Sequence, residues 1–234
     1  MSFFPSRSSL CLLACGLLAC PTLFICGCGS PGKGNLTSVE IAQKAKTLRE
    51  EAVTCFQRFI ASQTDVDKGI DIEALTCFVD RRKSTAALFP NAIDCPSCYA
   101  QYGEALRILG GYYRTLALKQ ASQAKNATGE KKMALETRSA ANRAKSELNL
   151  KMCLQQFNIN FLTGYASPAA YWSAFEAAYW LKQYSFALEF LKGYERNNVL
   201  NSSEKTKLEK WRQLTAKRQK EKLRAEVRKE LENK

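Results

Sequence analysis

The chain of 234 residues contains no histidine. Histidine is the usual general base of serine and cysteine hydrolases and the commonest metal ligand, so ordinary sites of both kinds are excluded. Proline and glycine are scarce, with 6 and 12 residues, which leaves room for long helices. No segment alternates apolar and polar residues as a half-buried strand does. We therefore expect an all-α protein that is not an enzyme, and we find no catalytic residue, metal site or cofactor signature.

The charge is strongly unbalanced, with 35 lysines and arginines against 22 acidic residues and a net charge of +13. Such a balance favours anionic partners, for example nucleic acid, lipid headgroups or an acidic protein. Lysine-rich helix surfaces that only face solvent give the same composition. The charge alone therefore leaves the partner open.

The first thirty residues have the layout of a secretory signal. One charge, Arg7, precedes an apolar run from Leu10 to Ile25. This run is shorter than the roughly 20 residues of a comfortable membrane span, although an uncleaved anchor helix remains the alternative. No A-x-A cleavage site follows, and the run ends instead in the cysteine-rich sequence ICGCGS.

This segment resembles the signals of bacterial lipoproteins, in which a small residue precedes a cysteine that is acylated and becomes the mature N-terminus. Cys28 follows Gly27 and leads into a flexible Gly/Ser/Pro-rich linker, residues 28–38. Cys20, which follows Leu-Leu-Ala, is the alternative lipidation site. The resemblance implies that residues 1–27 are a signal peptide and that the protein is attached to a membrane through an N-terminal lipid.

The same resemblance implies a location. Glycine rather than aspartate follows Cys28, which resembles the signal for sorting to the outer membrane. We therefore expect a protein of the bacterial cell envelope that faces the periplasm. Export conflicts with nucleic-acid binding by the basic tail, so we do not expect a nucleic-acid partner.

Beyond the linker, apolar residues recur at three- and four-residue steps, which predicts amphipathic helices. We expect antiparallel helical hairpins over residues 39–200 and a charged C-terminal helix over 203–234. Thr37 or Ser38 is expected to cap the first helix, and Asp71 the second. The C-terminal helix is expected to be a solvent-exposed extension, with docking to an acidic or membrane surface as the alternative.

Two kinds of internal similarity favour helical hairpins. The segments 51–56 and 73–78 both contain A-x3-F, and residues 172–179 partly match the pattern W-x2-L-G-x2-Y. Both resemble tetratricopeptide repeats, and Ser167–Asn197 is the best unit. The 22-residue offset between the A-x3-F segments departs from the usual period of about 34. The prediction is thus a divergent tetratricopeptide-like stack, with an irregular α-bundle as the alternative.

Five cysteines follow the lipoprotein-like segment. Because an exported chain meets an oxidising compartment, we expect disulfides among four of them and a buried, reduced thiol at the fifth, Cys153. Redox chemistry at the Cys-Pro-Ser-Cys sequence, or a zinc site of four thiolates, would need different surroundings or spacing. The four candidates for disulfides are Cys55, Cys77, Cys95 and Cys98.

We expect the chain to act as an envelope scaffold or adaptor that binds other proteins through its stacked hairpins. Aromatic side chains are frequent anchors at such interfaces, although aromatics at helical spacing more often form a core. The alternative function is an envelope thiol-disulfide protein that uses Cys95 and Cys98. The candidate partner-binding residues are Tyr171, Trp172, Tyr179 and Trp180.

Overall fold

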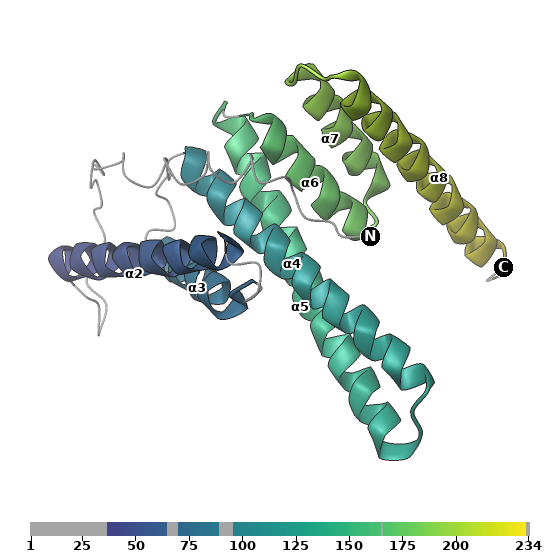
Figure 1. Ribbon diagram of the computed structural model, residues 1–234, viewed down its shortest axis with the longest axis horizontal. Helices are drawn as coiled ribbons and strands as arrows, with labels where there is room; N and C mark the ends of the chain where they lie inside the picture. Colours follow the sequence, from purple (N-terminus) through teal and green to yellow (C-terminus); the bar gives the residue numbers. More distant parts are fainter. Residues whose placement is uncertain (1–36, 65–69, 89–95, 165, 233–234) are drawn as a thin grey trace. The chain divides into compact units, whose positions relative to one another are not determined.

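The computed structural model describes residues 37–64, 70–88, 96–164 and 166–232, and every regular element within them is an α-helix (Figure 1). The predicted fold class is thereby confirmed. The helices are α2 (Ser38–Thr64), α3 (Ile72–Leu88), α4 (Pro96–Lys125), α5 (Gly129–Leu162), α6 (Pro168–Trp180), α7 (Tyr184–Arg196) and α8 (Ser202–Glu232).

The helices begin where the sequence supplies capping side chains. Thr37 and Glu40 form a capping box on α2, in which each backbone N–H donates to the other side chain. The Asp71 carboxylate accepts from the Ala74 N–H at 2.8 Å and caps α3. Both caps were predicted. Ser167 caps α6 in the same way, through the N–H of Ala170.

The chain forms two compact units, one up to Ala105 and one from Leu106. The boundary lies inside α4, so this single helix contributes to both units. In the first unit α2 and α3 pack as a helical hairpin. No proline or polar run marks the division in the sequence, because it falls within an uninterrupted helical pattern.

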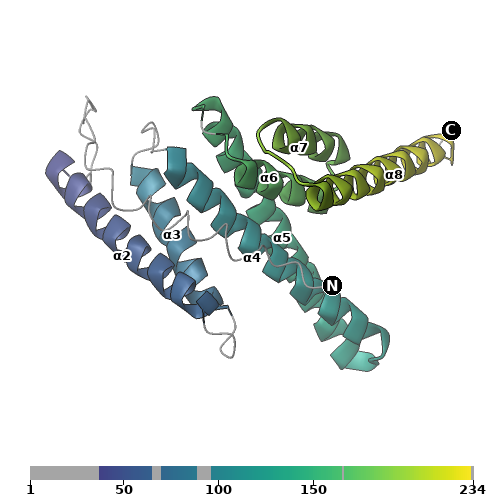
Figure 2. The same cartoon turned by 45° about the horizontal axis from the view of Figure 1, so that its top comes forward.

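The second unit is a series of packed hairpins, in which α5 contacts α6, α6 contacts α7, and α7 contacts α8 (Figure 2). The predicted hairpin Ser167–Asn197 is present as α6 and α7, with these two residues as its outer caps. A buried core joins it to α8 and consists of Phe175, Ala178, Ala187, Leu191 and Leu208.

Small and hydroxylated residues bring α4 and α5 close together. The Ser146 hydroxyl donates to the Gly110 carbonyl and the Ser139 hydroxyl to the Ala117 carbonyl, each at 2.8 Å. A Cβ atom at Gly110 would lie 2.7 Å from the Leu150 side chain, so only glycine fits there. Gly110 thus permits a close contact between the two helices.

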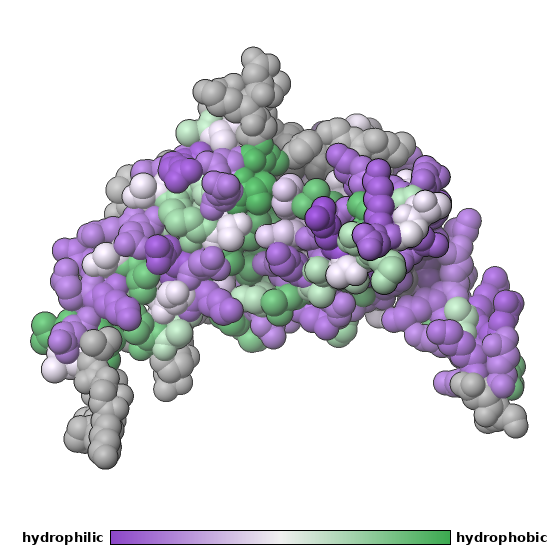
Figure 3. Space-filling view, turned by 90° about the horizontal axis from the view of Figure 1, so that it is seen from below, coloured by the Kyte–Doolittle hydropathy of each residue, from purple (hydrophilic) through white to green (hydrophobic). Residues whose placement is uncertain are grey.

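The second half of α8 is an extension, as the sequence predicted for its charged end. All residues from 221 to 232 are exposed. Figure 3 shows hydrophilic side chains prevailing on one face of the molecule. Leu208 and Thr215 are the residues of α8 that are buried, so packing fixes only the first half of this helix.

Candidate partner-binding surface

The four aromatic residues proposed to bind a partner are all half-buried on α6. Tyr171 stacks on Phe161 with ring centroids 4.4 Å apart and an interplanar angle of 13°. Tyr179 makes an edge contact with Trp211 of α8 at 5.4 Å. Neighbouring rings therefore hold these side chains in place, and their role in partner binding stays a prediction.

Trp180 lies at the end of α6 and meets α4. A Cβ atom at Gly111 would come within 3.2 Å of its indole ring, which shows that the ring lies against the α4 backbone. The Arg114 guanidinium lies 5.9 Å from the ring centroid, within cation–π range. Trp180 is thus a half-exposed, rigid ring with a cation beside it.

A largely buried ion pair connects α4 to α6. Arg107 donates to Glu176 at 2.7 Å, with 6 % and 14 % of the two side chains exposed. The indole N–H of Trp172 donates to the other carboxylate oxygen at 3.2 Å. Helical periodicity does not predict this pair, because its two members lie 69 positions apart in the sequence.

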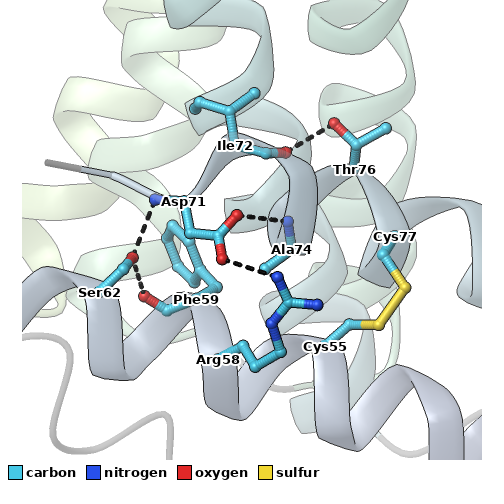
Figure 4. A network of polar contacts seen from close by, with 9 residues as sticks. All are labelled: Cys55, Arg58, Phe59, Ser62, Asp71, Ile72, Ala74, Thr76 and Cys77. Carbon is cyan, nitrogen blue, oxygen red and sulfur yellow. Dashed lines mark hydrogen bonds and ion pairs between the residues drawn. A yellow bond between two sulfur atoms is a disulfide. The ribbon is translucent and has the colours of Figure 1, made fainter. Parts of the chain in front are cut away.

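In the first unit, a disulfide and a polar network hold α2 against α3 (Figure 4). Cys55 and Cys77 form the disulfide, with their Cα atoms 5.9 Å apart. Beside it, Arg58 pairs with Asp71 at 3.1 Å. The Ser62 hydroxyl accepts from the Asp71 N–H at 2.9 Å, which ties the end of α2 to the start of α3.

The hydrogen bonds to Asp71 favour its charged form. The Ala74 N–H contributes most to lowering the pKa of Asp71, and the Arg58 guanidinium lowers it further. We interpret this network as structural, because the Asp71 carboxylate already caps α3 and pairs with Arg58.

The remaining cysteines divide into described and undescribed ones. Cys98, in the first turn of α4, is disulfide-bonded. Cys153 keeps its thiol and is fully buried, as predicted. The proposed lipidation sites Cys28 and Cys20, and the disulfide candidate Cys95, lie outside the described residues.

A groove that the sequence analysis did not predict runs between α4 and α5 near their connecting turn. Its volume is about 440 Å³. Two lysines, one from each helix, and an arginine of α5 stand around it, and Lys125, Lys132 and Arg143 form no ion pair with another described residue. The groove also contains one carboxylate, Glu136, and the small side chains Ala121, Ala124, Ser139 and Ala140.

The charge of the protein belongs to the unit that contains this groove. Residues 1–105 contain 10 basic and 10 acidic residues, whereas residues 106–234 contain 25 and 12. The second unit therefore carries the whole net charge of +13. The groove could have been indicated by basic residues four or more positions apart on a helix face that also carries small residues. This pattern becomes informative only when α4 is known to pair with α5.

No group of three or more potential metal ligands is assembled among the described residues. In the same ranges no helix is long and apolar enough to cross a membrane. Compared with known proteins, the chain matches no family model, no curated protein and no solved structure.

Proposed function

We propose that this chain is a lipid-anchored adaptor of the bacterial cell envelope, which holds another protein on the surface of its helical hairpins. The anchor is proposed from the sequence, in which Gly27-Cys28 resembles a lipoprotein processing site and a Gly/Ser/Pro-rich linker follows. The adaptor role is proposed from the surface of the second unit.

The adaptor role is proposed mainly from the rigid aromatic edge of α6, by which we mean the partly exposed ring of Trp180. Trp180 lies against the α4 backbone at Gly111 and beside Arg114, while part of its ring stays accessible. Tryptophan and arginine are enriched at the energetic centres of protein interfaces. A ring that is already held in one orientation loses little conformational entropy when a partner covers it.

The shape of the surface also favours a macromolecular partner. Two hollows among the described residues, of about 440 and about 370 Å³, are grooves between neighbouring helices. A small-molecule site normally encloses most of its ligand. A groove along a helix pair instead offers a long contact, which suits a polypeptide.

The test is photo-crosslinking in cells with a benzophenone amino acid at Lys182, two residues after Trp180. We expect a specific protein adduct that disappears in the Trp180→Ala variant and persists in Leu223→Ala, a matched change on the exposed end of α8. If Lys182 gives no protein adduct, or if both variants lose it equally, the aromatic edge is not the docking surface.

The lipid anchor is tested separately by the intact mass of the protein extracted from membranes. A chain that begins at Cys28 and carries an acyl-sized mass increment is expected. The increment should vanish in Cys28→Ser and remain in Cys20→Ser. The reverse pattern would move the lipid to Cys20, and an unprocessed, unmodified chain would refute the anchor.

The alternative function, thiol-disulfide exchange at Cys95 and Cys98, has one supporting observation. Cys98 is disulfide-bonded in the first turn of α4, as a member of an exchange pair in its oxidised form would be. An exchange protein should reduce insulin disulfides in the presence of dithiothreitol faster than its Cys98→Ser variant does. Equal rates would leave a structural disulfide as the role of Cys98.

A further inference from the structure

We propose that the groove between α4 and α5 binds an acidic polypeptide segment of the partner protein. This inference rests on the proposed adaptor function and adds to it the site and the chemistry of what is held. The groove lies at residues 121–143, between the paired helices α4 and α5 of the second unit.

The cations around the groove are available for a ligand. Lys125 of α4 and Lys132 and Arg143 of α5 are exposed and form no ion pair with another described residue. Elsewhere in the second unit some exposed cations pair, for example Lys192 with Glu189, whereas others on the exposed part of α8, such as Lys217, pair with no described residue. What distinguishes the groove is that its cations surround a hollow. With three cations and the single carboxylate of Glu136 around it, the groove has a net positive charge, with basic residues on both of its sides.

The spacing of these cations suits a chain better than a single small anion. Lys132 and Arg143 are eleven residues apart on α5, which corresponds to about 16 Å along the helix axis. One phosphate or carboxylate cannot reach both ends. An extended peptide, at about 3.3 Å per residue, spans the distance with about five residues.

The concave form of the groove favours a peptide over a membrane surface. Between the cations the lining side chains are short: Ala124 and Ser139 are buried at the bottom of the groove, and Ala121 and Ala140 are accessible. A narrow chain can enter such a groove and bring its carboxylates to the cations. A flat bilayer would touch only the ends of the long basic side chains.

The one carboxylate in the groove restricts the sequence of the segment. Glu136 lies on α5 between Lys132 and Arg143 and repels an acidic residue placed opposite its side chain. It can instead accept a hydrogen bond from a backbone N–H or a hydroxyl of the peptide. We therefore infer a segment with acidic residues at both ends and small neutral residues in the middle.

Fluorescence anisotropy with the purified full chain tests this proposal. The probe is a fluorescein-labelled peptide, Asp-Glu-Ser-Gly-Ser-Glu-Asp, and its control has asparagine and glutamine in place of the acids. We expect saturable binding of the acidic probe and none of the amide control. Raising salt from about 0.1 to about 1 M, which shortens the Debye length from about 10 to about 3 Å, should weaken the binding.

Two matched triple variants separate the groove from general charge. Lys125→Gln, Lys132→Gln and Arg143→Gln together should weaken probe binding at least tenfold, equivalent to about 1.4 kcal/mol. A control triple variant on the exposed end of α8 removes the same net charge and should change the affinity less than twofold. Its substitutions are Lys217→Gln, Lys220→Gln and Arg224→Gln.

Three results would overturn the proposal: no binding of the acidic probe, equal weakening by the two triple variants, or groove-dependent binding of phosphatidylglycerol vesicles without binding of the peptide. These failures are distinct from failure of the adaptor function. If crosslinking at Lys182 still captures a protein in the groove variant, the adaptor survives and only the acidic segment is refuted. If no partner is captured while the peptide binds the groove, the adaptor surface on α6 is refuted instead.

Discussion

Gly193 of α7 offers a sharp test of how the second unit is packed. A Cβ atom at this position would lie 2.5 Å from Cδ1 of Tyr171 and closer still to Cε1. Tyr171 cannot withdraw easily, because its ring stacks on Phe161 at 4.4 Å. We therefore expect the Gly193→Ala variant to displace a ring, even though alanine is normally the better residue inside a helix.

The expected change in the free energy of unfolding follows from two opposing contributions. Overpacking a core by one methyl group costs about 1–3 kcal/mol, and displacement of a stacked ring belongs at the upper end of that range. Replacing glycine by alanine in a helix interior returns about 1 kcal/mol. The Gly193→Ala variant should thus lower the free energy of unfolding of the second unit by about 2 kcal/mol.

A control background should reverse the sign of the change in stability that Gly193→Ala causes. In a Tyr171→Ala background the clashing ring is absent, so Gly193→Ala should stabilise the unit by about 1 kcal/mol. Urea unfolding followed by tryptophan fluorescence reads this unit selectively, since all three tryptophans lie beyond residue 105. If Gly193→Ala stabilises the protein in both backgrounds, α7 does not approach Tyr171 as described, and the packing argument is refuted.

Three further predictions concern contacts that hold each unit together. Arg107→Met should lower the free energy of unfolding of the second unit by about 3 kcal/mol in urea, because it leaves the Glu176 carboxylate buried without its cation. A smaller loss of stability in the double variant Arg107→Met with Glu176→Gln would confirm the pairing. Replacing Cys55 and Cys77 by serine should lower the free energy of opening of the α2–α3 hairpin by about 3 kcal/mol, since their disulfide closes a loop of 22 residues. Amide hydrogen exchange in α2 measures this free energy, and unchanged protection of the α2 amides would contradict the prediction. Because the folded pKa of Asp71 is lowered, its contribution is present above its unfolded pKa of about 4 and is lost as the pH falls through the folded value. The free energy of opening of the hairpin should therefore fall more steeply on acidification in the wild type than in Asp71→Asn, and an equal pH dependence of the two proteins would contradict a stabilising ionised cap.

The helices were predictable because their determinants are local. Thr37 and Asp71 mark helix starts by side-chain chemistry that acts within three residues, and the apolar spacing shows which face of each helix is buried. The disulfide between Cys55 and Cys77 was one of the pairings that antiparallel hairpin packing allowed. In each case the information needed lies within one hairpin.

The unpredicted features depend on which helix covers which face. The division of the chain at Ala105 falls within a continuous α4, where local sequence has no reason to change. The pairing of Arg107 with Glu176 joins residues 69 positions apart, and each alone is indistinguishable from a solvated surface charge. Long-range partners of this kind follow from packing rather than from periodicity.

The α4–α5 groove depends both on local helix signals, which the sequence shows, and on helix packing, which it does not. It therefore shows why a proposed binding surface could not be predicted from the sequence. Each of its helices alone presents an ordinary polar face, with lysines and an arginine that a solvated helix also carries. Lys125 and Lys132 line one groove because a short turn, residues 126–128, joins the two helices and Ser139 and Ser146 hold them side by side. Since like charges brought together on a folded surface oppose stability, an excess of three cations over one carboxylate around this groove is consistent with the proposed acidic ligand.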